Sequence, residues 1–217
     1  MNEAAYNELA LLIKHYPELE NCKDDIIASF HVITDCYKSG GLIMICGNGG
    51  SAADSSHIVG ELMKGFKKKR ALTTKQRHAI ETFYPGEGAE LADSLQRAIP
   101  AISLVEQSAL SSAFINDVNP EMVYAQQVFG YGKAGDVLMG LSTSGNSQNV
   151  VNACKVAKTL GVKTIAFTGR EGGCLSDICD ITLRAPATEV YRVQEYHLPI
   201  YHALCAMLEA ELMDDDS

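Results

Sequence analysis

The sequence predicts an α/β protein built on one doubly wound parallel sheet. Short, largely apolar runs indicate buried strands at 42–46, 137–141 and 163–167, with weaker candidates at 101–105 and 181–183. The first two runs lead through a turn rich in small residues into a helical pattern. Apolar strands followed by such turns and helices are typical of a parallel sheet that is covered on both faces. Strands and helices alternate along the chain, which favours a single domain over 1–217.

Helical segments precede and follow the strands. Residues 1–38 carry apolar side chains at helical spacing, interrupted at Pro17, and form a prelude that covers the sheet or packs against another subunit. A final helix is expected from about 190 to 213, ahead of the acidic tail 214–216.

The connection 67–100 is longer than the links of a compact α/β domain, and such connections are usually functional or mobile. It opens with the basic run 67–70. Because a run of charges is most often a solvated face, we interpret the segment as a surface loop or lid. A role in steering a phosphate is the alternative.

Composition narrows the class of protein. Of the 217 residues, 47% are hydrophobic and 21% are charged, as in an ordinary globular domain. The net charge of −9 argues against nucleic-acid binding, which requires a basic face. Seven cysteines without a CxxC pair indicate a reducing compartment. Residues 1–10 lack the basic start of a signal peptide and no apolar run is long enough for a membrane span, so we expect a cytoplasmic protein.

The turn 47–51, with the sequence GNGGS, follows the first strand and opens a helix. Glycines let the backbone approach a ligand closely, and a helix start offers unpaired N–H groups to an anion. The turn matches neither the Walker A motif nor the GxGxxG fingerprint, so no nucleotide is expected. A plain tight turn is the alternative.

The turn 142–147, with the sequence STSGNS, lies between a strand and a helix, where open α/β sheets bind ligands. Its four hydroxyls and the helix-start amides predict a neutral phosphate cradle. Capping of the following helix is the alternative, although a cap needs only one hydroxyl.

A third set of polar residues lies on two helices. His57 and Glu61 are four residues apart and share a helix face. The final helix carries a second group: Gln194, Glu195, His197 and His202. Such residues could bind a metal or share acid–base work, and the alternative is that they are ordinary surface side chains.

Together these residues resemble the sugar isomerase (SIS) domain family and, within it, the phosphoheptose isomerase branch. The matching stretches are CGNGGSAADSSHIVGEL (46–62), IND (115–117), GDVLMGLSTSGNSQNVVNA (135–153), FTGREGG (167–173) and VQEYHLPIYHAL (193–204). They are spread over nearly all the chain except 67–100. The combination of GNGGSAAD, STSGNS and QExHxxxxH is far more specific than any one of them.

The resemblance implies a three-layer sandwich, the SIS fold, in which helices flank a five-stranded parallel sheet. It also implies a homotetramer with active sites between subunits. The implied enzyme is an aldose–ketose isomerase that interconverts sedoheptulose 7-phosphate and D-glycero-D-manno-heptose 7-phosphate by proton transfer through an enediol(ate).

The resemblance also assigns residues. The phosphate would be held by Ser51, Ser142, Thr143, Ser144 and Ser147. Further substrate contacts would come from Asn48, Gly49, Gly50, Asp117 and Gln194. In the zinc-binding members the metal ligands fall on His57, Glu61, Gln194 and His202. The catalytic acid–base pair falls on Glu61 and His202.

The chemistry accounts for these residue types. A carboxylate and an imidazole on opposite sides of an enediol(ate) suit the transfer of a proton between neighbouring carbons. Zn²⁺ would polarise the carbonyl, although Glu61 cannot easily be a tight ligand and a free base at once.

Two features depart from the family pattern. Members often have Gly-Arg three and four residues after the catalytic glutamate, where this chain has Lys64 and Gly65. The segment 67–100 is also longer than in compact members. Both differences bear on the sugar rather than on the reaction type.

Three alternatives to a phosphoheptose isomerase follow. One is a non-catalytic SIS protein similar to the DnaA initiator-associating protein, and another is a sugar-phosphate sensor. Retention of Glu61 and His202 argues against both, because a binding protein needs no acid–base pair. The third is an isomerase of another phosphosugar.

Overall fold

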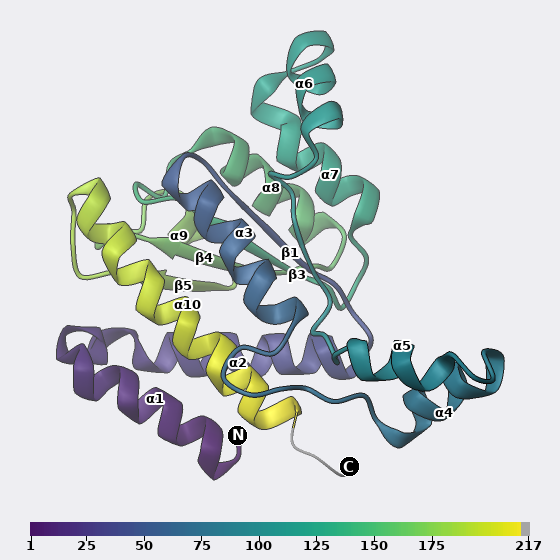
Figure 1. Ribbon diagram of the computed structural model, residues 1–217. Helices are drawn as coiled ribbons and strands as arrows, with labels where there is room; N and C mark the ends of the chain where they lie inside the picture. Colours follow the sequence, from purple (N-terminus) through teal and green to yellow (C-terminus); the bar gives the residue numbers. More distant parts are fainter. Residues whose placement is uncertain (214–217) are drawn as a thin grey trace.

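The computed structural model describes residues 1–213, and the acidic tail 214–216 lies outside the described residues. Its centre is a five-stranded sheet in which neighbouring strands are parallel, in the order β2-β1-β3-β4-β5 (Figure 1). The strands are β1 (Ile43–Gly47), β2 (Ala101–Ser103), β3 (Val137–Leu141), β4 (Lys163–Thr168) and β5 (Ile181–Arg184). The predicted α/β fold class is confirmed, with each strand within a few residues of its expected position.

The central strands are unbroken apolar runs because both faces of the sheet are buried. In β1, Ile43 and Ile45 lie in one hydrophobic core, while Met44 and Cys46 lie in the other. Successive side chains of a strand point to opposite faces, so a middle layer needs apolar residues at every position. The first core is covered by α1 (Glu3–His15), α2 (Lys23–Lys38), α3 (Gly50–Met63) and α10 (Val190–Leu212), and the second by α7 (Val123–Tyr131) and α8 (Gln148–Thr159).

The N-terminal helices are separated by the 3₁₀ turn η1 (Pro17–Cys22). Pro17 occupies the first position of that turn, where its missing N–H costs no helical hydrogen bond. The long helix α10 packs against α1, and the side chain of Asn2 donates to the main-chain oxygen of Ala210 at 2.9 Å. Within residues 1–213, no helix combines the length and the apolar character that a membrane crossing requires.

The segment 67–100 contains two short helices, α4 (Thr74–Phe83) and α5 (Gly88–Ser94). They pack on each other and project from the body of the domain as a hairpin (Figure 1). The two ends of the hairpin meet at a narrow neck. There the main-chain N–H of Arg97 donates to the oxygen of Arg70 at 2.8 Å, and its Nε donates to the oxygen of Ala71 at 2.9 Å.

Arg70 corrects the interpretation of the basic run 67–70 as a solvated face. Its side chain is fully buried, and its Nε donates to Oε1 of Glu209 on α10 at 2.7 Å. The guanidinium also donates to the main-chain oxygens of Leu62, at 2.6 Å, and Glu61, at 3.0 Å. These are carbonyls at the end of α3, which have no partner within their own helix.

Glu209 is equally well partnered. Its carboxylate accepts the main-chain N–H groups of Phe66 and Lys67, both at 2.8 Å. Burial by itself would raise the pKa of Glu209, but these N–H groups and the Arg70 guanidinium outweigh it and lower the pKa. The buried pair therefore ties three elements together: the end of α3, the start of the following segment and α10.

We expect Arg70→Met to destabilise the fold by about 3–5 kcal/mol, because it leaves the Glu209 carboxylate buried without its cation. The matched control is Arg77→Met on α4, where the pairs with Glu81 and Asp93 are exposed and should each contribute less than about 1 kcal/mol. Urea denaturation followed by circular dichroism measures both values. Equal losses in the two variants would contradict a structural role for the buried pair.

Candidate functional site

The two turns predicted to bind phosphate lie side by side at the carboxyl edge of the sheet. The chain passes from β1 to β2 on one side and later to β3 on the other, so β1 and β3 are neighbours. Ligands bind at such a switch point in open α/β sheets. A reciprocal amide pair joins the two turns there. Asn48 Nδ2 donates to Asn149 Oδ1 at 2.9 Å, and Asn149 Nδ2 donates to Asn48 Oδ1 at 3.0 Å.

A cavity of about 590 Å³ opens beside this amide pair. Asn48 and Ser147 line it from the two turns, and residues of α6 (Ser108–Asp117), η2 (Pro120–Met122) and α7 form the opposite wall. On that wall, the Tyr124 hydroxyl donates to the main-chain oxygen of Gly47 at 2.7 Å and so anchors the first turn.

The turn 142–147 presents its hydroxyls at two depths. Ser142 is buried, and its Oγ lies 2.9 Å from the Oγ of Ser147. Thr143 is half-buried and Ser144 is exposed. Within residues 1–213, the Ser147 side chain makes no capping hydrogen bond to α8, although Ser147 is the N-cap residue. Capping therefore does not account for this hydroxyl, which lies at the helix start with the Ser142 hydroxyl as its neighbour.

Glycine at position 145 lets the turn pack against a second loop. Gly145 has φ of +68°, and a Cβ there would lie 1.9 Å from the main-chain oxygen of Gly172. The Asn146 side chain accepts the N–H of Cys174 at 2.9 Å across the same contact. The shape of the turn is therefore fixed by its neighbour as well as by its own sequence.

At the first turn, 47–51, the helix α10 lies close to the start of α3. Gly49 precedes the helix with φ of +54°, and a Cβ on Gly50 would lie 2.6 Å from Nε2 of Gln194. Gln194 therefore lies over the N-terminus of α3, and Ser51 is buried in its first turn. Asp117 is exposed at the far end of α6, and it does not line the cavity beside the turns.

The predicted acid–base residues come together at the other end of α3. His57 Nε2 lies 3.2 Å from Glu61 Oε1 and 3.5 Å from His202 Nε2. Lys64 Nζ lies 3.3 Å from the other oxygen of Glu61. The Glu61 side chain is 15% exposed and that of His57 is 43% exposed, so the cluster is open to a ligand from the His57 side.

The cluster forms because α3 and α10 run side by side in the same direction. Along the two helices Gly50 lies opposite Gln194, and His57 lies opposite His202. The steps from Gly50 to His57 and from Gln194 to His202 are seven and eight residues, about two helical turns, so these positions share one face of each helix. Beyond the end of α3, the main-chain N–H of Phe66 donates to Glu209 on α10.

His202 is partly buried within the cluster. Burial lowers its pKa, the neighbouring His57 lowers it further, and the Glu61 carboxylate opposes both effects. His202 is therefore a neutral imidazole near pH 7, able both to donate and to accept a proton.

Two residues near the cluster were missed by the sequence reasoning. The Tyr201 hydroxyl donates to Asp54 Oδ1 at 3.1 Å and lies 3.0 Å from His57 Nδ1. The spacing of Asp54, His57 and Glu61, at three and four residues, would have placed Asp54 on the same face of α3. Nothing local in the sequence pairs Tyr201 with that face.

His197 and Glu195 do not belong to the cluster. His197 is fully buried, its Nε2 lies 3.1 Å from the main-chain oxygen of Thr168, and burial lowers its pKa to about 4. Glu195 forms a surface ion pair with Arg192 at 2.6 Å. Their grouping with His202 by sequence spacing is corrected accordingly.

No set of three or more His, Cys, Asp or Glu side chains is arranged to hold a metal ion in the part of the chain that the structure describes. The cluster nevertheless offers two imidazole nitrogens and a carboxylate, which are donor types that zinc uses. The fourth predicted ligand, Gln194, lies against Gly50 rather than beside His57.

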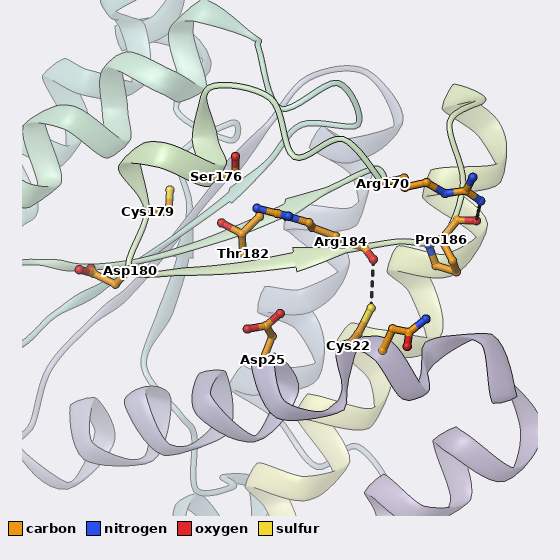
Figure 2. Close-up of a pocket in the computed structure, with 10 residues that line it drawn as sticks. Cys22, Asp25, Arg170, Ser176, Cys179, Asp180, Thr182, Arg184 and Pro186 are labelled. Atoms are coloured by element: carbon orange, nitrogen blue, oxygen red, sulfur yellow. Dashed lines mark hydrogen bonds between the residues drawn. The ribbon is translucent and has the colours of Figure 1, made fainter.

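A second cavity, of about 610 Å³, lies between α2 and the outer strand β5 (Figure 2). Two hydrogen bonds lie among the residues that line it. Cys22 Sγ donates to the main-chain oxygen of Arg184 at 3.0 Å, and Arg170 Nη2 donates to the main-chain oxygen of Pro186 at 2.9 Å. None of the predicted site residues lines this cavity, so the candidate site remains at the two turns and the cluster.

A family model described as the SIS domain matches residues 7–77 and 77–169. The chain therefore belongs to the SIS-domain family, as the resemblance of its motifs predicted.

Within that family the chain is similar to phosphoheptose isomerases. It is 36% identical over 204 residues to the enzyme of a Nitratiruptor species, with 91% of this chain and 94% of the relative covered. It is 33% identical over 212 residues to that of Akkermansia muciniphila, with 98% of each covered. Among solved structures, phosphoheptose isomerase GmhA from Neisseria gonorrhoeae matches with a TM-score of 0.70 at 30% identity, over 92% of this chain and 94% of that one.

Proposed function

We propose that this chain is a phosphoheptose isomerase, which interconverts sedoheptulose 7-phosphate and D-glycero-D-manno-heptose 7-phosphate. The observation that carries the proposal is the cluster of Glu61, His57 and His202 in a chain of this family. An acid–base cluster at the end of α3 is what an aldose–ketose isomerase needs and a binding protein does not.

In this mechanism Glu61 is the base. Its carboxylate removes the proton from the carbon next to the carbonyl, which leaves an enediol(ate), and returns it to the neighbouring carbon. The Lys64 ammonium lies 3.3 Å from Oε2 of Glu61 and forms an ion pair with this carboxylate.

His202 moves protons between the two sugar oxygens. A neutral imidazole can accept a hydroxyl proton on one nitrogen and donate from the other, so it suits a step in which one oxygen loses a proton and the next gains one. The phosphate would be held by the hydroxyls of 142–147 and by the N–H groups at the starts of α3 and α8.

We further propose that the cluster binds Zn²⁺. The separations of 3.2 Å and 3.5 Å between His57 Nε2 and its two neighbours support this. Metal–ligand bonds of about 2.0–2.1 Å in a tetrahedron place ligand atoms roughly 3.3 Å apart. Gln194 would complete the set after leaving Gly50. A bound Zn²⁺ would polarise the sugar carbonyl and stabilise negative charge on its oxygen.

The same geometry supports a site shared between subunits. Ser51 and Glu61 lie ten residues apart on α3, which corresponds to roughly 15 Å along the helix. Asp117 also does not line the cavity of its own chain. We propose a homotetramer in which neighbouring copies bring these groups together, located in the cytoplasm, where the seven free thiols would remain reduced.

A second candidate is an isomerase of another phosphosugar. Lys64, which contacts Glu61, stands where family members often have glycine, and the α4–α5 hairpin begins close by. Assaying a panel of ketose phosphates, with and without Zn²⁺, distinguishes the two candidates by the preferred substrate.

The phosphate cradle predicts that replacing Ser144 and Ser147 together with alanine weakens phosphosugar binding. Two lost hydrogen bonds to a charged group correspond to about 3 kcal/mol or more, which is roughly a hundredfold in Kd. Calorimetric titration measures the change. Ser112→Ala, on the exposed face of α6, is the matched control and should leave affinity unchanged. Wild-type affinity in the double variant would rule the cradle out.

Glu61→Gln keeps the shape of the side chain but removes the base. It should retain phosphosugar binding and lose turnover by roughly a hundredfold to ten-thousandfold. In D₂O, the wild type should exchange deuterium into the carbon next to the carbonyl of a ketose phosphate, and Glu61→Gln should not. Glu90→Gln, on the hairpin, should behave as the wild type. Exchange at the wild-type rate in Glu61→Gln would show that another group is the base.

The proposed assembly predicts a tetramer in light scattering at micromolar concentration. Exposed apolar side chains such as Val118 and Phe129, both 66% exposed, support contacts between copies. A monomer under these conditions would defeat the shared-site model.

A further inference from the structure

A row of polar contacts next to the cluster joins Asp54, Tyr201 and His57. Tyr201 is fully buried, and its hydroxyl donates to Asp54 Oδ1 at 3.1 Å. The Tyr201 oxygen also lies 3.0 Å from Nδ1 of His57. The other ring nitrogen of His57, Nε2, faces Glu61 and His202. The row thus connects a core tyrosine to the imidazole at the centre of the cluster.

Counting hydrogens gives the direction of these contacts. A hydroxyl has one hydrogen to donate, and a carboxylate can only accept. The Tyr201 hydrogen therefore goes to Asp54, and the Tyr201 oxygen is left to accept from His57. A neutral imidazole carries one N–H. With that hydrogen on Nδ1 the Tyr201 oxygen is satisfied, and Nε2 presents a lone pair.

We propose that Tyr201 and Asp54 are positioning residues that hold neutral His57 in its Nδ1–H tautomer and aim the Nε2 lone pair at Glu61 and His202. The role assigned to the cluster rests on the proposed function, whereas the tautomer is argued from the contacts of Tyr201 with Asp54 and His57.

In this tautomer, His57 Nε2 and Glu61 Oε1 are both acceptors, and a cation or a shared proton between them would satisfy both. The lone pair of His57 Nε2 faces a carboxylate oxygen at 3.2 Å, and two acceptors cannot satisfy each other. Histidines that bind metals usually donate their other ring N–H to a neighbouring oxygen in this way, and that bond fixes the ring. In this chain the neighbouring oxygen is the Tyr201 hydroxyl.

The experiment is nitrogen NMR of protein labelled with ¹⁵N-histidine, at a pH where the imidazoles are neutral and without metal. The His57 signals are assigned by their loss in His57→Gln. In the wild type, we expect His57 to carry its hydrogen on Nδ1. Tyr201→Phe keeps the buried ring but removes the acceptor, so His57 should shift toward the Nε2–H form. Asp54→Asn should shift part of the population, because an amide can donate as well as accept.

A second readout is the affinity for zinc alone, measured by competition with a chelator. Loss of an outer contact of this kind typically weakens metal affinity or activity by about 10- to 100-fold, and we expect that range for Tyr201→Phe. Tyr196→Phe is the matched control on the same helix. Its ring lies against Arg192, so neither readout should change.

Two outcomes would overturn the proposal: a wild-type His57 that carries its hydrogen on Nε2, or a tautomer unchanged in Tyr201→Phe. Thermal unfolding of each variant shows whether the fold is kept, and Asp54→Asn provides the test if Tyr201→Phe fails to fold. Neither NMR result depends on turnover. A wild type with the expected tautomer but no activity on any ketose phosphate would count against the proposed function and leave the positioning role in place.

Discussion

The buried ion pair between Arg70 and Glu209 holds the two helices that carry the proposed chemistry. Arg70 satisfies the last carbonyls of α3, including that of Glu61, and Glu209 lies two turns beyond His202 on α10. The proposed base, Glu61, and the His202 imidazole therefore lie on elements joined by one buried ion pair. A buried charge pair is costly to desolvate, but it has one preferred geometry, and that geometry sets how α3 lies against α10.

The sheet supplies the other half of the site. Because β1 and β3 are neighbours, their turns meet at one edge, and the Asn48–Asn149 amide pair bridges them. Helix α3 then runs from this neutral, hydroxyl-rich edge to the titratable cluster. The groups proposed for anion binding and for proton transfer thus lie at opposite ends of one helix, and each end can keep an environment suited to the chemistry proposed for it.

Much of this arrangement could be predicted from local sequence, and the remainder depends on tertiary contacts. The strands and turns were predictable because period, glycines and hydroxyls are local signals, and the pairing of His57 with Glu61 follows from helical spacing. The burial of Arg70 was not, because its partner lies 139 residues away and its neighbours are solvated lysines. The contact of Tyr201 with His57 depends likewise on how α10 lies along α3. His197, four residues from Tyr201, shows that a polar residue on the same helix can belong to the core instead.

The neck of the α4–α5 hairpin has a consequence for how this chain can vary. Arg97 bonds to the main chain at positions 70 and 71, so the hairpin leaves and rejoins the domain at almost the same point. Everything beyond the neck can be lengthened, shortened or exchanged at a small cost in loop entropy, because the ends are already closed. Arg70 stands on the domain side of that boundary. The hairpin can therefore be replaced without moving α3. Among related proteins, we expect sequence and length variation to concentrate between residues 71 and 97.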